Sequence, residues 1–116
     1  MIVVADTSPL NYLALIGEIE LLPSLYQKVL IPEEVHRELQ REQTPEVVRN
    51  WAVSLPPWCE VRAVNLTSDP ALCELDPGER DAIELALQAG IDTVLMDEIA
   101  GRHEAARRRL RVIGTV

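Results

Sequence analysis

The sequence contains few aromatic residues: two tryptophans, two tyrosines and no phenylalanine in 116 positions. Proteins that hold single-stranded nucleic acid without sequence preference stack successive bases on aromatic side chains, so we expect no stacking platform of that kind. Long hydrophobic runs are also missing, because no apolar stretch approaches the roughly 20 residues of a membrane-spanning helix. These scarcities argue against an aromatic nucleic-acid groove and against a membrane protein.

Cysteine is equally scarce. Cys59 and Cys73 are the only two and form no C-x-x-C pattern, so we expect reduced thiols rather than a disulfide framework. His36 and His103 stand alone, without partners at the spacing of zinc ligands. The chain runs from Met1 straight into a strand-like segment, without the basic leader and long apolar stretch of a signal peptide. We therefore expect a cytoplasmic protein.

Positive charge is in short supply, since 11 Lys and Arg residues stand against 19 Asp and Glu residues, for a net charge of -8. This is the wrong sign for a protein that gains affinity by neutralising phosphates. An acidic balance commonly serves solubility alone, but a cluster of metal-binding carboxylates produces it as well. The basic residues gather late in the chain, at Arg102, Arg107, Arg108, Arg109 and Arg111.

The apolar segments alternate between two patterns. Continuous runs of β-branched or small apolar residues predict buried strands, and segments of helical periodicity between caps and glycines predict helices. We expect strands at residues 2–5, 28–31, 60–64, 93–96 and 111–116, helices that begin near Ser8 (as N-cap), Pro32, Thr44, Asp76 and Glu98, a short helical turn at 19–25 and a loop at 67–70. This alternation predicts a parallel α/β sheet in a single domain over residues 1–116.

Two acidic residues directly follow predicted buried strands: Asp6 and Asp97. In a parallel α/β sheet, ligands bind beyond the carboxyl ends of the strands, so both side chains are expected at that edge. Either could instead be a turn residue that caps the next helix, although the occurrence of two weighs against this. Thr7 and Ser8 follow Asp6, and their hydroxyls could orient its carboxylate or hold a metal-bound water; Ser8 is also a suitable N-cap.

A third candidate carboxylate lies on a predicted helix. Glu38 sits beside the apolar stripe of Val35 and Leu39, a position from which its side chain could reach from the rim of the core into a cleft. The alternative is a solvated glutamate paired with Arg37 or Arg41 at helical spacing. Glu38 is therefore a site residue only if its side chain faces the predicted site.

Glu79 is a fourth candidate, in the first turn of a helix capped by Asp76. It could be the capping-box partner of Asp76, or it could point toward the strand ends, where the helix dipole favours a carboxylate. Asp81 is a competitor two residues further on. Arg102, one helical turn after Asp97, could contact a substrate phosphate or lie on a solvated helix face. Hard oxygen ligands of this kind suit Mg²⁺ or Mn²⁺.

Five short motifs follow one another along nearly the whole chain: Val4-Ala5-Asp6-Thr7-Ser8-Pro9-Leu10, Arg37-Glu38-Leu39, Leu75-Asp76-Pro77-Gly78-Glu79, Leu95-Met96-Asp97 and Val112-Ile113-Gly114-Thr115. In their order and spacing, these motifs resemble the PIN-domain family, and most of all the VapC-type toxin ribonucleases and related prokaryotic PIN proteins. This resemblance implies a three-layer α/β/α sandwich with a mainly parallel central sheet.

The resemblance also implies an activity, the Mg²⁺- or Mn²⁺-dependent endonucleolytic cleavage of RNA, often by the toxin of a toxin–antitoxin pair and often by a homodimer. It makes Asp6, Glu38, Glu79 and Asp97 the catalytic acids, with Asp6 and Asp97 as metal ligands and Thr7 or Ser8 as the accompanying hydroxyl. The family's third acid usually stands 18 residues before the last, where this chain has Glu79. Asp81 instead matches the Asp-Ala-hydrophobic pattern of some relatives, so this choice stays open. Similar members continue past the Gly-Thr close with another helix, which this sequence lacks.

Other functions fit the residues less well. A phosphatase-type domain with Asp6 as nucleophile usually has a second Asp two residues on, where this chain has Ser8, and a late lysine, whereas Lys28 is the only lysine. A dinucleotide-binding fold would need a glycine-rich turn after the first strand. The remaining alternative is an inactive PIN-fold module that acts through protein partners.

Overall fold

The computed structural model describes residues 1–65 and 69–115. Within this part of the chain, strands and helices alternate, as the sequence pattern predicts. The strands are β1 (Ile2–Ala5), β2 (Lys28–Pro32), β3 (Cys59–Arg62), β4 (Thr93–Leu95) and β5 (Arg111–Ile113). The helices are α1 (Thr7–Leu15), α2 (Leu21–Leu25), α3 (Glu33–Glu38), α4 (Glu46–Val53), α5 (Pro70–Cys73), α6 (Pro77–Ala89) and α7 (Ile99–Arg107).

The strands form one sheet in the order β3-β2-β1-β4-β5, and each neighbouring pair is parallel. Parallel strands need a crossover connection, which returns the chain to the same starting edge each time. The carboxyl ends of the strands therefore lie at one edge of the sheet. The parallel α/β sheet predicted from the sequence is confirmed.

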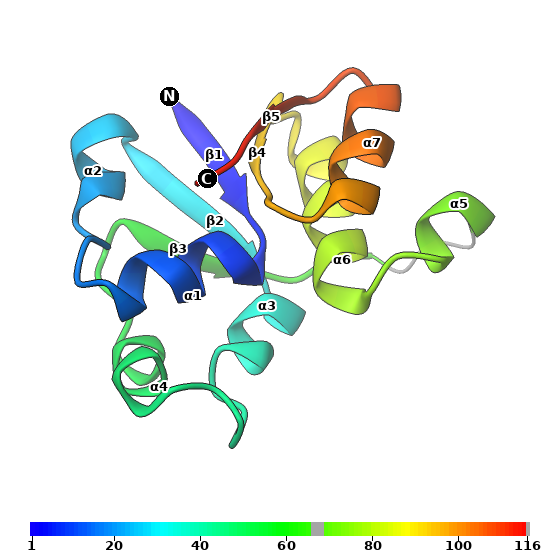
Figure 1. Ribbon diagram of the computed structural model, residues 1–116. Helices are drawn as coiled ribbons and strands as arrows, with labels where there is room; N and C mark the ends of the chain where they lie inside the picture. Colours follow the sequence, from blue (N-terminus) through cyan, green and yellow to red (C-terminus); the bar gives the residue numbers. More distant parts are fainter. Residues whose placement is uncertain (66–68, 116) are drawn as a thin grey trace.

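Helices cover both faces of the sheet. In β1, Val3 and Ala5 belong to the core beneath α1–α4, whereas Val4 belongs to the core beneath α5–α7. This alternation follows from the two-residue period of a strand, and burial on both faces explains why the strand reads as a continuous apolar run. Figure 1 shows α1, α2 and α4 on one side of the sheet and α6 and α7 on the other. The three-layer α/β/α architecture is thus confirmed.

The start of α1 differs from the prediction. The N-cap is Asp6, in an extended conformation, and the helix begins at Thr7; the expectation that Ser8 is the N-cap is wrong. Pro9 consequently occupies the third helical position rather than the first. This is tolerated because the first backbone N–H groups of a helix have no intrahelical acceptor. The shift gives Asp6 a fixed place at the junction of β1 and α1.

The chain around residue 70 also differs from the expected loop. Pro70–Cys73 forms the short helix α5, with Asp69 accepting a hydrogen bond from Ala71 N at 3.0 Å. Residues 67 and 68 of the loop predicted at 67–70 lie outside the described residues, and Asp69 is the N-cap of α5. A single turn of helix has too few positions to show periodicity, which is why the sequence does not indicate it.

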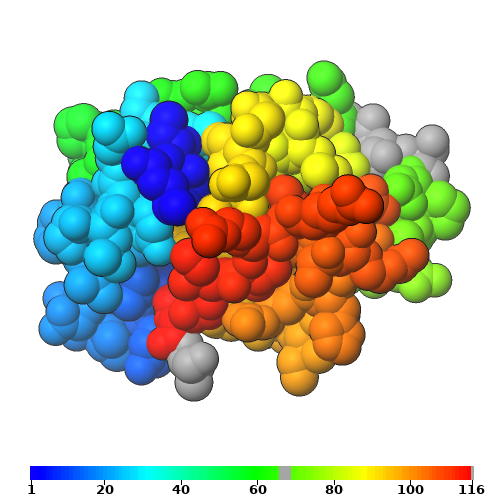
Figure 2. All heavy atoms as spheres, turned by 90° about the horizontal axis from the view of Figure 1, so that it is seen from above, coloured from blue at the N-terminus to red at the C-terminus, as the bar shows by residue number. Residues whose placement is uncertain are grey.

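The edge strands are short. β5 ends at Ile113, so the strand predicted for residues 111–116 is too long, although Val116 itself lies outside the described residues. Figure 2 shows the C-terminal segment at the surface, between the N-terminal half of the chain and α7. No helix in residues 1–65 and 69–115 is long and apolar enough to cross a bilayer.

Candidate active site

Acidic residues from several elements gather at the carboxyl edge of the sheet. Asp6 links β1 to α1, and Asp97 lies between β4 and α7. Glu38 is the last residue of α3, while Glu79 lies in the first turn of α6, whose N-cap is Asp76. Elements from both halves of the chain therefore supply carboxylates to the same region.

Asp6 is the most enclosed of these carboxylates, with an exposed fraction of 2%. Burial is the largest cause that raises the pKa of Asp6 to about 7, and the charges of Asp76, Glu38 and Glu98 raise it further. A hydrogen bond from the backbone N–H of Thr7 acts in the opposite direction. The pKa of Asp6 thus lies close to neutrality because its charge is desolvated among other carboxylates.

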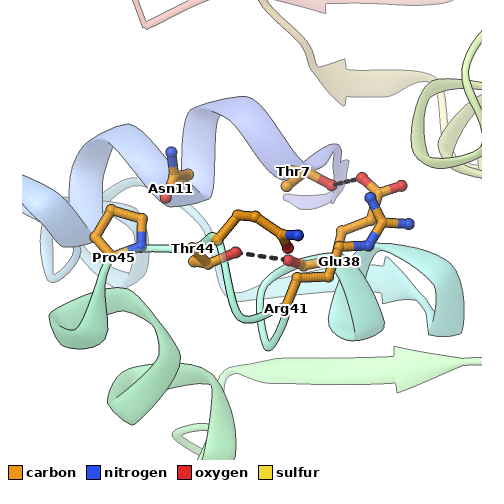
Figure 3. A pocket seen from close by; sticks show the side chains of 7 residues that line it. Thr7, Asn11, Glu38, Arg41, Thr44 and Pro45 are labelled. Carbon is orange, nitrogen blue, oxygen red and sulfur yellow. Dashed lines mark hydrogen bonds between the residues drawn. The ribbon is translucent and has the colours of Figure 1, made fainter.

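Glu38 points toward Asp6. Its Oε1 accepts a hydrogen bond from Thr7 Oγ1 at 2.5 Å, as Figure 3 shows. A Cβ atom on Gly78 would lie 2.6 Å and 2.8 Å from the two carboxylate oxygens of Glu38 and 3.1 Å from Asp6 Oδ1. The two carboxylates therefore approach the same stretch of α6 backbone, which only a glycine leaves open. Burial raises the pKa of Glu38.

The alternative partners of Glu38 are engaged elsewhere. Arg37 and Arg41 both pair with Glu34, Arg41 at 3.5 Å. The solvated ion pair considered for Glu38 is thus formed by Glu34 instead. The Thr7 hydroxyl thus orients Glu38, and the charge of Arg41 lowers the pKa of Glu38 less than burial raises it.

Glu79 is buried, with an exposed fraction of 5%, and its Oε1 has no hydrogen-bond partner among the described residues. Asp76 Oδ1 accepts the backbone N–H of Glu79 at 3.1 Å, which is one half of the predicted capping box. Burial, followed by the charge of Asp76, raises the pKa of Glu79 to about 8. A Cβ atom on Gly101 of α7 would lie 3.0 Å from Glu79 Oε1, so the two helices meet closely here.

Asp81 lies in a different environment. It forms an ion pair with Arg80 at 2.8 Å and lines a cavity with Glu33, Arg37 and Val64. The charge of Glu79, by contrast, interacts with that of Asp6. The geometry thus groups Glu79, and not Asp81, with the carboxylates at the sheet edge.

Asp97 is well supplied with hydrogen bonds. Thr115 donates to its two oxygens from N and from Oγ1, each at 2.7 Å. Arg102 Nη1 donates to Met96 O at 3.2 Å, so its guanidinium lies at the end of β4. Gly114 permits this arrangement, because a Cβ there would clash with Arg102 and lie 3.1 Å from Asp97 Oδ1. The C-terminal segment therefore fixes the orientation of Asp97.

These side chains do not yet surround a single point. In residues 1–65 and 69–115, no group of three or more His, Cys, Asp and Glu side chains is arranged to hold a metal ion as it stands. The donor set nevertheless fits a hard divalent cation, because it consists of oxygens and includes the unpartnered Glu79 Oε1. The raised pKa values show that ionising Asp6 and Glu79 in the folded protein costs free energy. A nearby cation would lower that cost by stabilising the ionised carboxylates.

Several residues of this region have roles that the sequence pattern alone does not indicate. The pattern predicts Asp76 only as a helix cap, yet its charge acts on both Asp6 and Glu79. Gly78 and Thr115 stand out in the sequence only as parts of short motifs. A glycine in the first turn of a helix, between two acids, is the available signal for Gly78, since alanine would favour the helix more.

A family model described as a PIN domain matches residues 2–116. The chain belongs to the PIN-domain family. The match spans all the described strands and helices. No curated protein matches the chain. A PIN domain is a nuclease-type fold that generally uses divalent metal ions, which agrees with the position and chemistry of the carboxylates at the sheet edge.

Gly78→Ala should weaken metal binding at the site while leaving the stability of this PIN domain almost unchanged. The added methyl group would displace the flexible end of Glu38, whereas alanine favours a helix over glycine by up to about 1 kcal/mol. We expect the free energy of unfolding to change by less than about 1 kcal/mol, while the rise in Tm on adding Mn²⁺ becomes smaller. Thermal denaturation with Mn²⁺ or with EDTA measures both quantities.

Gly90→Ala is the matched control at the other end of α6. Gly90 has a φ of 69°, and a Cβ there would meet no other atom within 4 Å, so only backbone strain opposes the substitution. It should lower stability by about 1 kcal/mol and leave the response to Mn²⁺ intact. Equal responses of the two variants to Mn²⁺ would contradict the convergence of Glu38 and Asp6 at Gly78.

The stability of the metal-free protein should depend on pH. Asp6 and Glu79 have pKa values of about 7 and about 8 when folded, above the ordinary values of 3.8 and 4.5. The folded state therefore binds protons more tightly, so this stabilisation is complete below about pH 4 and is lost as pH rises through 7 to 8. Tm in EDTA should fall between about pH 5 and pH 9.

Mn²⁺ should oppose this loss near pH 8 and have little effect near pH 5, because protons compete with the metal for carboxylates. Asp6→Asn should flatten the pH dependence in EDTA. Melting curves across this range provide the test. A Tm in EDTA that rises with pH over the same range is the contrary result.

Proposed function

We propose that this PIN domain is a divalent-metal-dependent endoribonuclease. The main support is the pair of buried carboxylates, Asp6 and Glu79. Burial and neighbouring carboxylates raise both pKa values, and no cationic side chain is among the main influences on either value. Strongly perturbed carboxylates at the carboxyl edge of a parallel sheet are typical of functional sites. Their cost to stability is understandable if the bound state contains a cation.

In this proposal, Asp6 and Asp97 hold Mg²⁺ or Mn²⁺, and Glu38 and Glu79 bind it directly or through water. The cation would supply positive charge beside the scissile phosphate and acidify a water molecule for attack on phosphorus. The chain's own contribution is orientation. Thr7 directs Glu38, and Thr115 holds both oxygens of Asp97. Arg102, at the end of β4, is placed to meet a phosphate if its guanidinium leaves Met96 O.

The biological setting proposed is that of a toxin-type PIN nuclease in the cytoplasm, with RNA as substrate, an antitoxin protein as a regulatory partner and a homodimer as the working form. The alternative is a catalytically inactive module that acts through protein partners. One observation favours it, namely that Glu38 and Asp97 already have hydrogen-bond partners within the protein. The two proposals differ in whether the carboxylates matter for RNA cleavage.

Asp6→Asn should abolish the activity. The substitution removes a metal-binding charge, so Mn²⁺-dependent cleavage of a mixed RNA panel should fall by more than about 100-fold, beyond the roughly 10- to 100-fold typical of outer-shell partners. Asp92→Asn is the control, because Asp92 precedes β4 at the opposite edge of the sheet. Gel analysis of labelled RNA with Mn²⁺ or EDTA gives the result. Equal residual cleavage by wild type and Asp6→Asn would argue for a contaminant or for the inactive module.

A second comparison addresses the third acid. Glu79→Gln should reduce kcat by more than about 10-fold, whereas Asp81→Asn, which only breaks an ion pair with the half-buried Arg80, should change it by less than about 3-fold. Glu79→Gln should also raise Tm in EDTA above about pH 8, where the folded wild type carries the buried charge. Steady-state kinetics on one RNA oligonucleotide decides the matter. The reverse order of the two effects would assign the role to Asp81.

A further inference from the structure

The place of the Glu38 carboxylate depends on what holds the end of α3. Glu38 is the last residue of this helix, which is only six residues long. A hollow of about 600 Å³ lies beside Glu38, between α1 and the segment that joins α3 to α4, as Figure 3 shows. Side-chain packing around Glu38 is therefore incomplete, whereas close packing fixes most side chains of a protein interior. Hydrogen bonds must supply part of its positioning.

Two hydroxyl groups form hydrogen bonds with Glu38. Thr7 Oγ1 donates to Oε1 of the side chain at 2.5 Å, and Thr44 Oγ1 donates to the backbone carbonyl at 2.9 Å; Figure 3 shows both. The last carbonyl groups of an α-helix lack partners within the helix. Arg41 N also reaches Glu38 O, at the longer distance of 3.3 Å. The Thr44 hydroxyl is thus the closer of these two donors at the end of α3.

Thr44 is itself anchored to α4. Arg49 of α4 donates from Nε to Thr44 O at 2.9 Å. A second connection joins the two helices directly, from His36 Nε2 to Ala52 O at 2.9 Å. Val48 and Ala52 are fully buried, so α4 is held by the core on that face of the sheet. Through Thr44, the end of α3 is therefore linked to a helix whose position the core fixes.

We propose that Thr44 is a positioning residue for Glu38. Its hydroxyl joins the end of α3 to the connecting segment and to α4, and so keeps the Glu38 carboxylate beside Thr7 and Asp6. This inference rests on the proposed function, because it takes Glu38 as one of the acids that bind the cation. Thr44 acts through the backbone of Glu38, so its contribution is orientation and not chemistry.

A hydroxyl that bonds to a backbone carbonyl is common in proteins, and this chain offers one for comparison. Ser24 Oγ donates to Leu21 O at 2.6 Å, a local and exposed bond between residues three positions apart in α2. The Thr44 bond is partly buried and reaches back from the connecting segment to the helix that carries Glu38. Loss of the Ser24 bond should disturb α2 alone, whereas loss of the Thr44 bond should release an acid of the site. Ser24→Ala is therefore the matched control.

The first experiment measures Mn²⁺ binding by the whole protein and needs no RNA. The Kd follows from the rise of Tm with Mn²⁺ concentration. Thr44→Val keeps the shape of the side chain and removes the donor, so the Kd should rise by roughly 3- to 10-fold, at or below the low end of the 10- to 100-fold typical of groups that bond directly to a metal ligand. Thr44→Ser, which retains the hydroxyl, and Ser24→Ala should both keep the wild-type Kd.

The second experiment tests whether the effect passes through Glu38. Adding Thr44→Val to Glu38→Gln should change the Mn²⁺ Kd by less than about 2-fold, because the carboxylate that Thr44 orients is already absent. In steady-state cleavage of one RNA oligonucleotide, Thr44→Val alone should lower kcat by roughly 3- to 10-fold and change KM by less than about 2-fold, since Thr44 orients an acid and binds no substrate.

Arg49→Met serves as a second variant if Thr44→Val does not fold. It breaks the bond to Thr44 O and leaves the Thr44 hydroxyl in place. The Mn²⁺ Kd should rise by at least about 2-fold. Arg107→Met is its control, because Arg107 is exposed and pairs with Glu104 of α7. An unchanged Kd in Arg49→Met overturns the inference.

The outcomes separate this inference from the ribonuclease proposal. An unchanged Mn²⁺ Kd in Thr44→Val, with or without a lower Tm in EDTA, assigns the residue at most a structural role and overturns the inference; RNA cleavage that is lost in Asp6→Asn then leaves the nuclease standing. An equal rise in Kd in the Glu38→Gln background also overturns it. A rise in Kd that disappears in that background, without cleavage of any RNA, supports the inference and overturns the nuclease. A wild type whose Tm does not respond to Mn²⁺ overturns both.

Discussion

The unneutralised carboxylates at the carboxyl edge of the sheet are the constraint on which the rest of this structure depends. Asp6 and Glu79 are 2% and 5% exposed, and other carboxylates are the charges that raise their pKa values. A buried charge without a partner costs free energy that a protein usually avoids by pairing it or by protonation. A sequence shaped for stability alone would replace these residues with apolar ones. Their presence in an otherwise well-packed PIN domain agrees with the divalent metal ions that this fold generally uses.

The parallel topology is what brings the acids together. β1 and β4 are neighbours in the sheet, with Ala5 paired to Leu95, and Asp6 N donates to Leu95 O at 3.0 Å. An acid that follows β1 and an acid that follows β4 therefore emerge at the same edge of the sheet, although most of the chain separates them. The first turn of α6 then approaches from the other layer, and Gly78 lets its backbone come within contact distance of Glu38 and Asp6. The crossover connections that make the sheet parallel thus also place the acidic residues at one edge of it.

This dependence also explains how much can be predicted from the sequence. Strand periodicity indicates the parallel sheet, and the sheet places Asp6 and Asp97 at its carboxyl edge without any further information. To predict Glu38 and Glu79, one must know which face of its helix each side chain occupies, and helical periodicity gives that face only to within a neighbouring position. For Glu79, a role in a capping box agrees equally well with the sequence. The role of Thr115 cannot be predicted, because its hydrogen bonds to Asp97 join residues 18 positions apart in the sequence. A small change in the start of α1, from Ser8 to Asp6 as N-cap, is enough to alter which hydroxyl meets which carboxylate.

The acidic net charge and a polyanionic substrate can be reconciled through the same carboxylates. At a net charge of -8, the metal-free protein repels phosphate over a distance of about one Debye length, roughly 8 Å at physiological salt. Near the site, Arg41 pairs with Glu34 and Arg102 donates to Met96 O, and these two positive charges are outnumbered by the surrounding carboxylates. A divalent cation held by the carboxylates would offset two of their negative charges and present a positive centre where the scissile phosphate must sit. Metal would then be needed for RNA to bind as well as for RNA to be cut, and the acidic composition would act against binding of RNA to the metal-free protein.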